Sequence, residues 1–229
     1  MKRGVRFFIG VVACLAACTV GVAAATLDEF RGVIASIPVA NESRIMAALA
    51  LGQRSGFPAD ETYRLFERVA GVTGAAADKE AILLVVVEAI ESGLPVDSLL
   101  NKAFEGLARG VSLSTLGHLL DVRLRLLEGT SDLFGRCRIF RASQGAVVAA
   151  GSTALAPSVF DALLSNVGDA LGDYVESGGS PLESQRIYNQ VEARLTLLAG
   201  TAFSADDVEL VLSRVEPADL TRVVLAALS

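Results

Sequence analysis

Ser55-Gly56-Phe57-Pro58 recurs as Ser92-Gly93-Leu94-Pro95, 37 residues further along the chain. A second pair of segments, Gly71-Val72-Thr73 and Gly110-Val111-Ser112, lies 39 residues apart. Each copy therefore holds a helix end, a Gly-x-Pro turn, a helix and a Gly-Val-hydroxyl segment that opens the next helix. Glycine favours the left-handed position after a helix, and proline or a hydroxyl residue favours the start of the next one. The copies predict helical hairpins that stack on one another, and the alternative is an irregular bundle with the same caps.

The segments around these turns have helical periodicity. Gly110 ends a helix predicted from residue 95, and Gly129 ends one predicted from residue 113. Ser158 with Asp161, and Ser204 with Asp207, are typical of further helix starts. Residues 82–87 are wholly apolar, but charged residues flank them within a longer helical window, so we predict a buried helix there. The apolar stripes consist of Leu100, Ala103, Phe104 and Leu107; of Leu113, Leu116, Leu120, Leu124 and Leu127; and of Phe160, Leu163, Leu164, Val167, Leu171 and Tyr174.

The patterns predict an all-α fold of antiparallel helical hairpins, arranged as a degenerate repeat array or an irregular bundle. Residues 26–129 would hold the hairpin repeats and residues 158–229 a C-terminal helical segment, with a possible third copy of the turn at residues 177–181. Between them, residues 130–157 form a Gly-rich connection. We interpret it as a plain link between two helical halves, with a hinge or lid as the alternative.

The first 25 residues resemble an export signal. Three basic residues, Lys2, Arg3 and Arg6, precede an apolar run over residues 7–22. Within the run, Leu15-Ala16-Ala17-Cys18 has the form of a lipobox, which predicts a signal peptide of residues 1–17 and lipid attachment at Cys18. Ala23-Ala24-Ala25 is an alternative cleavage site, giving a signal of residues 1–25 and an unanchored periplasmic or secreted protein. The sequence predicts contact with the membrane through the N-terminal lipid alone.

Charge and composition restrict the partners. The formal charge is −6, and removal of the three basic signal residues leaves −9. A negative protein is a poor ligand for nucleic acid or anionic lipid, so we expect an envelope protein or an apolar ligand as partner. After loss of Cys14 and lipidation or loss of Cys18, only Cys137 remains, so no internal disulfide is expected. We interpret Cys137 as a small buried side chain, with a reactive thiol as the alternative.

Catalytic and metal-binding patterns are weak. The single histidine, His118, falls on a polar helix stripe with Ser114, Asp121, Arg125 and Glu128, which predicts a solvent-facing side chain. No Gly-x-Ser-x-Gly segment accompanies it. One histidine without cysteines does not make a zinc site, and the acidic clusters lack the spacing of a calcium loop. We therefore expect no metal and no cofactor.

Residues 82–93 end in Glu91-Ser92-Gly93 and resemble the helix-ending Glu-Ser-Gly segment of lytic transglycosylases, which are all-helical envelope enzymes. The resemblance implies that Glu91 is a general acid that protonates a glycosidic oxygen of peptidoglycan, with its pKa raised by apolar surroundings. The segment after Pro95 departs from that family, and Glu176-Ser177-Gly178 repeats the triplet at another helix end.

Residues 93–111 resemble a segment of uncharacterised exported bacterial helical proteins, with a Glu-Gly-Leu-Ala-Lys/Arg-Gly-Val core and no known activity. Helical spacing places Glu105 within reach of Lys102 and Arg109, which predicts a surface charge ladder. Gly106 in mid-helix predicts close approach of another helix. The candidate helix-packing or partner face is Asn101, Lys102, Glu105, Gly106 and Arg109.

Together the patterns favour an exported, lipid-anchored envelope protein with a non-catalytic binding or structural role. Peptidoglycan cleavage through Glu91 is the first alternative. The second is a periplasmic carrier of an apolar ligand, which requires a cavity beneath residues 146–156.

Overall fold

The computed structural model describes residues 24–136, 139–142 and 153–176. Within these residues helices dominate, as the sequence predicts, and the fold is all-α apart from a two-stranded sheet. The elements are α2 (Leu27–Ala35), α3 (Glu42–Ser55), α4 (Ala59–Gly71), α5 (Ala76–Glu91), α6 (Asp97–Ala108), α7 (Leu113–Arg136), β1 (Ile139–Arg141), β2 (Thr153–Leu155) and α8 (Pro157–Glu176).

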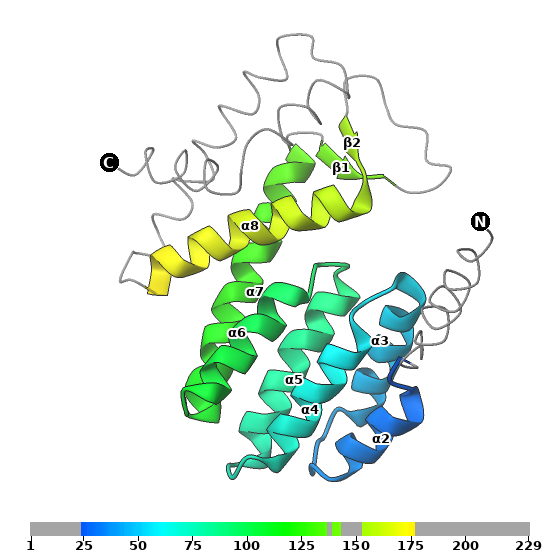
Figure 1. Ribbon diagram of the computed structural model, residues 1–229, viewed down its shortest axis with the longest axis vertical. Helices are drawn as coiled ribbons and strands as arrows, with labels where there is room; N and C mark the ends of the chain where they lie inside the picture. Colours follow the sequence, from blue (N-terminus) through cyan, green and yellow to red (C-terminus); the bar gives the residue numbers. More distant parts are fainter. Residues whose placement is uncertain (1–23, 137–138, 143–152, 177–229) are drawn as a thin grey trace, which may run out of the picture.

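Helices α2 to α7 stack in two layers. In one layer α3 packs against α5 and α5 against α7, while in the other α2 packs against α4 and α4 against α6. The layers are joined by packing within the pairs α2 and α3, α4 and α5, and α6 and α7. Figure 1 shows these helices side by side, in sequence order from α2 in blue to α7 in green. The alternation of layers is that of a helical-hairpin array, in which each pair buries a face of the next.

The Gly-x-Pro turns connect one hairpin to the next. Gly56 and Gly93 of these turns have φ angles of 80° and 66°, and Gly110, in the Gly-Val-Ser segment between α6 and α7, has a φ angle of 70°, which confirms the predicted left-handed caps. The residue after each glycine donates its N–H to the carbonyl oxygen five residues earlier, with N···O distances of 3.2, 2.9 and 3.0 Å. The same bond in all three places gives each helix end the same exit geometry.

The second repeated segment is only half equivalent in structure. Ser112 accepts a hydrogen bond from the Thr115 N–H at 3.2 Å at the start of α7, as predicted. Gly71, in contrast, is the last residue of α4 and is not among the positive-φ glycines, and α5 begins only after Ala75. The prediction of a left-handed cap at Gly71 and a hydroxyl cap at Thr73 is therefore wrong.

Helix α5 lies at the centre of the array. The apolar run at residues 82–87, predicted as a buried helix, is part of α5, and four of its six side chains have no measurable exposure: Ile82, Leu83, Val86 and Val87. Because α3 covers one side of α5 and α7 the other, the helix needs no polar stripe along most of its length.

The C-terminal part of the described chain differs from the predicted boundaries. Helix α7 passes through Gly129 and ends at Arg136, so the predicted stop is wrong. Leu133 and Phe134 extend its apolar stripe, and the Phe134 ring packs edge-on against Phe160 of α8 with 5.7 Å between ring centroids. Packing with α8 therefore extends the helix by two turns beyond the expected glycine cap.

Three further elements, β1, β2 and α8, lie in the Gly-rich connection or begin at its end. β1 and β2, which the sequence did not predict, pair in parallel with Ile139 opposite Thr153. Helix α8 begins at Pro157, and Asp161 pairs with Arg141 instead of forming a box with Ser158. Figure 1 shows α8, in yellow, crossing α7. Among the helices described here, none is both long and apolar enough to cross a bilayer.

Candidate functional site

The candidate face on α6 divides into an inward and an outward part. Gly106 is buried, and a Cβ atom at this position would lie 2.6 Å from Cδ1 of Leu116 on α7. This is the close helix approach that the sequence predicts. The Lys102 side chain is only 14% exposed, whereas that of Arg109 is 72% exposed. Asn101 is also exposed and the Glu105 side chain is 41% exposed, so Asn101, Glu105 and Arg109 are the members of the face that a partner could reach.

The predicted charge ladder is present on α6. Glu105 pairs with Lys102 at 3.3 Å and with Arg109 at 2.7 Å. The hydrogen bond from Lys102 holds the pKa of Glu105 below its usual value. Partial burial opposes the charge on Lys102, but hydrogen bonds to Glu176 and Glu105 outweigh it and raise its pKa. Lys102 therefore connects the surface ladder to Glu176 of α8.

A buried arginine on α7 joins α6 to α8. The Arg123 side chain is 7% exposed, and its Nη2 lies 3.0 Å from Oδ1 of Asp169 and 3.4 Å from Oδ1 of Asp173. Its Nη1 lies 3.3 Å from Oε1 of Glu176. Ser98 of α6 accepts from Nε at 3.2 Å and donates to Asp169. We call Ser98, Arg123, Asp169, Asp173 and Glu176 the α8 clamp.

Sequence reasoning missed the α8 clamp, although two signals for it exist. Arg123 lies three residues after Leu120 and four before Leu127, so it falls on the apolar stripe of its helix. Asp169, Asp173 and Glu176 follow the spacing of one helix face. An arginine on an apolar stripe predicts a carboxylate partner on the element that covers it, because a buried charge requires pairing.

Glu91 is held in an ion pair. Nη2 of Arg44 lies 2.6 Å from its Oε2, and the Glu91 side chain is 35% exposed. The hydrogen bond from Arg44 lowers the pKa of Glu91 and outweighs the opposing effect of partial burial. A general acid needs a raised pKa in apolar surroundings. Glu91 therefore has the opposite of the environment that the transglycosylase hypothesis requires.

The polar stripe of α7 faces solvent, as predicted. His118 is exposed, and Arg125 lies near the carboxylates of Glu128, Glu88 and Asp121 at 2.9, 2.9 and 3.4 Å. The pair with Glu88 connects α7 to α5, just as the pair between Arg44 and Glu91 connects α3 to α5. These ion pairs, which are separate from the charge ladder on α6, link neighbouring helices across the layer of α3, α5 and α7.

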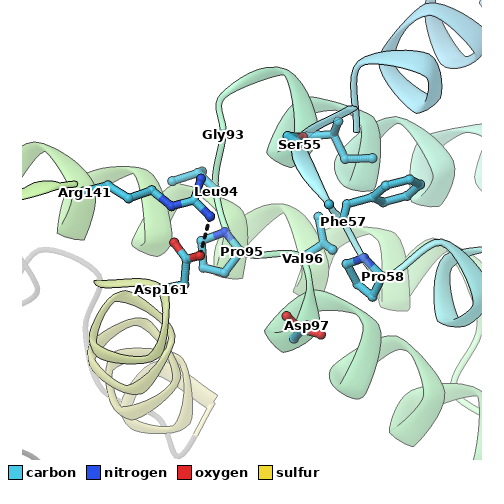
Figure 2. A pocket seen from close by; sticks show the side chains of 12 residues that line it. Ser55, Phe57, Pro58, Gly93, Leu94, Pro95, Val96, Asp97, Arg141 and Asp161 are labelled. Carbon is cyan, nitrogen blue, oxygen red and sulfur yellow. Dashed lines mark hydrogen bonds and ion pairs between the residues drawn. The ribbon is translucent and has the colours of Figure 1, made fainter. Parts of the chain in front are cut away.

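A small groove lies where the two Gly-x-Pro turns meet the end of β1 and the start of α8. It has a volume of about 110 Å³. Figure 2 shows the Arg141 and Asp161 ion pair beside Leu94 and Pro95, with Phe57 and Pro58 further along the groove. Sites for small molecules typically occupy about 300–1,000 Å³ and are largely apolar. The groove is too small and too charged at one end to hold a sizeable apolar ligand.

Several predicted features lie outside the described residues. These are the lipid-attachment residue Cys18, the lone Cys137, residues 146–152 above the predicted carrier cavity, and the possible third turn at residues 177–181. Within the described part of the chain, no cluster of three or more His, Cys, Asp or Glu residues is arranged to hold a metal ion.

Comparison with known proteins adds no relative. No family model, curated protein or solved structure was found to match this chain.

Proposed function

We propose that the protein is exported, anchored by a lipid on Cys18, and acts as a non-catalytic binding or structural component of the bacterial cell envelope. The two-layer stacking of α2 to α7 is the observation that supports this proposal most strongly. Stacked helical hairpins present an extended surface built from successive helices, and such surfaces suit binding of another protein.

The face proposed for a partner is the exposed side of α6. Asn101 and Arg109 are exposed there, while Glu105 carries the ladder between them. The inward members, Gly106 and Lys102, fix the helix against α7 and α8. A rigid helix with an exposed arginine near its C-terminus is suited to a protein partner with acidic groups. An envelope protein of this kind is the proposed partner.

Removal of the lipid-attachment residue tests the anchor. In a bacterial host, the wild-type protein should fractionate with membranes and have the mass of a chain beginning at Cys18 plus lipid. The Cys18→Ala variant should lose the lipid mass and leave the membrane fraction. A wild-type chain without lipid, recovered away from the membranes, would contradict the anchor.

Site-specific crosslinking tests the partner face. A photoreactive amino acid at Asn101 or Arg109 should give the same envelope-protein adduct. Placed at Glu42, an exposed position on α3, it should give none. The adduct formed at Asn101 should weaken in an Arg109→Glu variant, because the arginine charge is reversed. Equal labelling at all three positions would contradict a defined face on α6.

The enzymatic alternative has its own readout. If the protein cleaved peptidoglycan through Glu91, purified wild-type protein would release soluble fragments from cell-wall material and Glu91→Gln would not. We expect no release from either protein, because the ion pair with Arg44 keeps Glu91 ionised. Release that depends on Glu91 would replace the binding role with an enzymatic one.

A further inference from the structure

Ala25, the last residue of the alternative signal peptide, is built into the folded domain. Its side chain is buried, with 7% exposure. Its N–H donates to Oδ1 of Asp60 at 2.7 Å, and its carbonyl oxygen accepts from Nε2 of Gln53 at 2.9 Å. Asp60 lies in the first turn of α4 and Gln53 near the end of α3. The N–H of Ala25 is therefore bound to α4 and its carbonyl oxygen to α3.

The next residue continues this arrangement. Thr26 caps α2, with Oγ1 accepting from the Glu29 N–H at 3.3 Å while Oε2 of Glu29 accepts from the Thr26 N–H at 2.6 Å. The Thr26 carbonyl accepts from the N–H of Phe30, a fully buried core residue. The peptide bond between Ala25 and Thr26 thus lies between two residues with fixed partners in the array.

Cleavage of that bond would remove part of the domain. The Asp60 carboxylate and the Gln53 side-chain amide would lose their partners. Because both hydrogen bonds are partly buried, this loss would cost folding free energy. The new terminus would also place an ammonium group at the N-terminus of α2, where the helix dipole favours negative charge. A cut upstream of Ala25 leaves every one of these contacts intact.

We infer that the signal peptide is removed upstream of Ala25, and this inference rests on the proposed export. Ala25 then remains in the mature protein and fixes the N-terminal segment of the protein to α3 and α4. Cleavage adds one water across a single peptide bond, and Ala17–Cys18 is the upstream bond that the lipobox marks. In the lipid-anchored form, the Cys18 sulfur first forms a thioether with the diacylglyceryl group of a phospholipid. The carbon–oxygen bond between the diacylglyceryl group and the phosphate breaks, the phosphate-bearing headgroup leaves, and the thiol proton is released with it.

The position of Ala25 sets the reach of the anchor. Ala25 lies seven positions after Cys18, and an extended chain of seven residues spans at most about 25 Å. The fixed point lies beside the end of α3, next to the turn at residues 55–58 that lines one side of the groove. The edge of the array that carries this turn is therefore held close to the bilayer surface.

The N-terminus of the full-length protein exported by a bacterial host provides the first test. Intact mass and N-terminal sequencing should give a first residue at or before Ala25, with Cys18 and its lipid expected. A first residue of Thr26 would overturn the inference but would leave export intact. An uncleaved chain retained in the cytoplasm would contradict the proposed export, and the test in the next paragraph would still decide the role of Ala25.

Matched substitutions in the full chain give the second test. Asp60→Ala should lower the urea midpoint of unfolding more than Glu61→Ala, because both residues are in the first turn of α4 but only Asp60 contacts Ala25. Asp60→Asn retains an oxygen acceptor and should recover most of the loss. Equal midpoints for Asp60→Ala and Glu61→Ala would show that Ala25 is not fixed by Asp60 and would overturn the inference.

Discussion

Helices α5 and α8 both pack against α7, but they do so through different chemistry. α5 brings mainly apolar side chains to α7, including Ile82, with Glu88 pairing with Arg125 at the exposed edge, and it is covered by α3 on its other side. α8 brings two buried glycines, Gly168 and Gly172, and three carboxylates that surround Arg123. Both interfaces bury apolar side chains, among them Leu164, Val167 and Leu171 of α8. The comparison indicates that the α8 interface adds close backbone approach and a buried charge to this hydrophobic burial.

The two interfaces should therefore fail separately. Burial of hydrocarbon couples α5 to the whole array, since its loss opens contacts to α3 and α7 together. Removal of a buried charge partner acts on the element that carries the opposite charges. Local opening of α8 with the array still folded is the behaviour expected of such a divided structure.

The largest effect is expected in α5. Leu83 has no exposed surface, and Leu83→Ala should lower the free energy of unfolding by about 2–5 kcal/mol because it leaves a cavity. Urea denaturation followed by circular dichroism measures the change. Hydrogen exchange should accelerate in α3, α5 and α7 alike. A loss below about 1 kcal/mol would contradict the central role of α5.

Arg123→Ala should act on α8 alone. Because Asp169 and Asp173 are 40% and 73% exposed, water replaces part of the lost pairing, and we expect a loss of about 1–3 kcal/mol. Hydrogen exchange should accelerate in residues 157–176 and stay unchanged in α5. Arg125→Ala is the control, because Arg125 also lies on α7 and meets three carboxylates, two on α7 and one on α5, but is 53% exposed, and its loss should cost less than about 1 kcal/mol. Equal losses of stability in Arg123→Ala and Arg125→Ala would contradict a special role for the buried arginine in holding α8.

Gly168→Ala tests the close backbone approach. The added Cβ would lie 2.5 Å from Cδ2 of the fully buried Leu127, so we expect a loss of about 1–2 kcal/mol from overpacking. In Gly135→Ala the new Cβ meets no atom within 4 Å, and stability should stay the same or rise slightly. Thermal unfolding of both variants against wild type measures the difference. A neutral Gly168→Ala would mean that α8 can shift along α7.

The smallest expected effect is a pH-dependent loss of stability on substitution of Glu80 in the array. The carboxylate of Glu80 accepts from the Asn41 side chain and from the N–H groups of Asn41 and Ala40, and these bonds lower its pKa. The ionised Glu80 carboxylate stabilises the folded protein above about pH 4.3, the pKa of a glutamate in the unfolded chain. This stabilisation is lost as the pH falls through the lower pKa of Glu80 in the folded protein. Glu80→Gln should therefore cost less than about 1 kcal/mol at neutral pH and nothing at low pH.

Urea midpoints between pH 3 and pH 7 measure this dependence. Glu42→Gln, on the exposed start of α3, serves as the matched control for loss of a surface carboxylate. A difference between Glu80→Gln and wild type that grows as pH falls would contradict the assigned role of Glu80.

The array was predictable because its signals are local. The caps at Gly56, Gly93 and Gly110 and the buried leucines of α7 follow from turn chemistry and helical period over a few residues. The C-terminal errors arise from long-range contacts. α7 passes Gly129 because α8 covers Phe134, and β1 forms because β2 pairs with it across an intervening segment. Local patterns contain neither partner.

The candidate site follows the same division. The ladder of Lys102, Glu105 and Arg109 is contained within one helix and was predicted. The ion pair of Glu91 with Arg44, 47 residues away, was not predicted, and it reverses the expected shift in the pKa of Glu91. Arg123 could have been flagged from its place on an apolar stripe, but its partners on α8 required the packing itself.

The wholly apolar run at residues 82–87 of α5 also affects the unfolded chain. Four of the six residues at positions 82–87 are β-branched and the other two are leucines, a composition that favours strands and intermolecular pairing. The segment is helical in the folded protein because α3 and α7 cover it on two sides. Before those helices are in place it is an aggregation-prone stretch, so refolding yield should fall steeply with protein concentration. A cell that exports the chain unfolded would need a chaperone to shield this stretch until α7 has arrived.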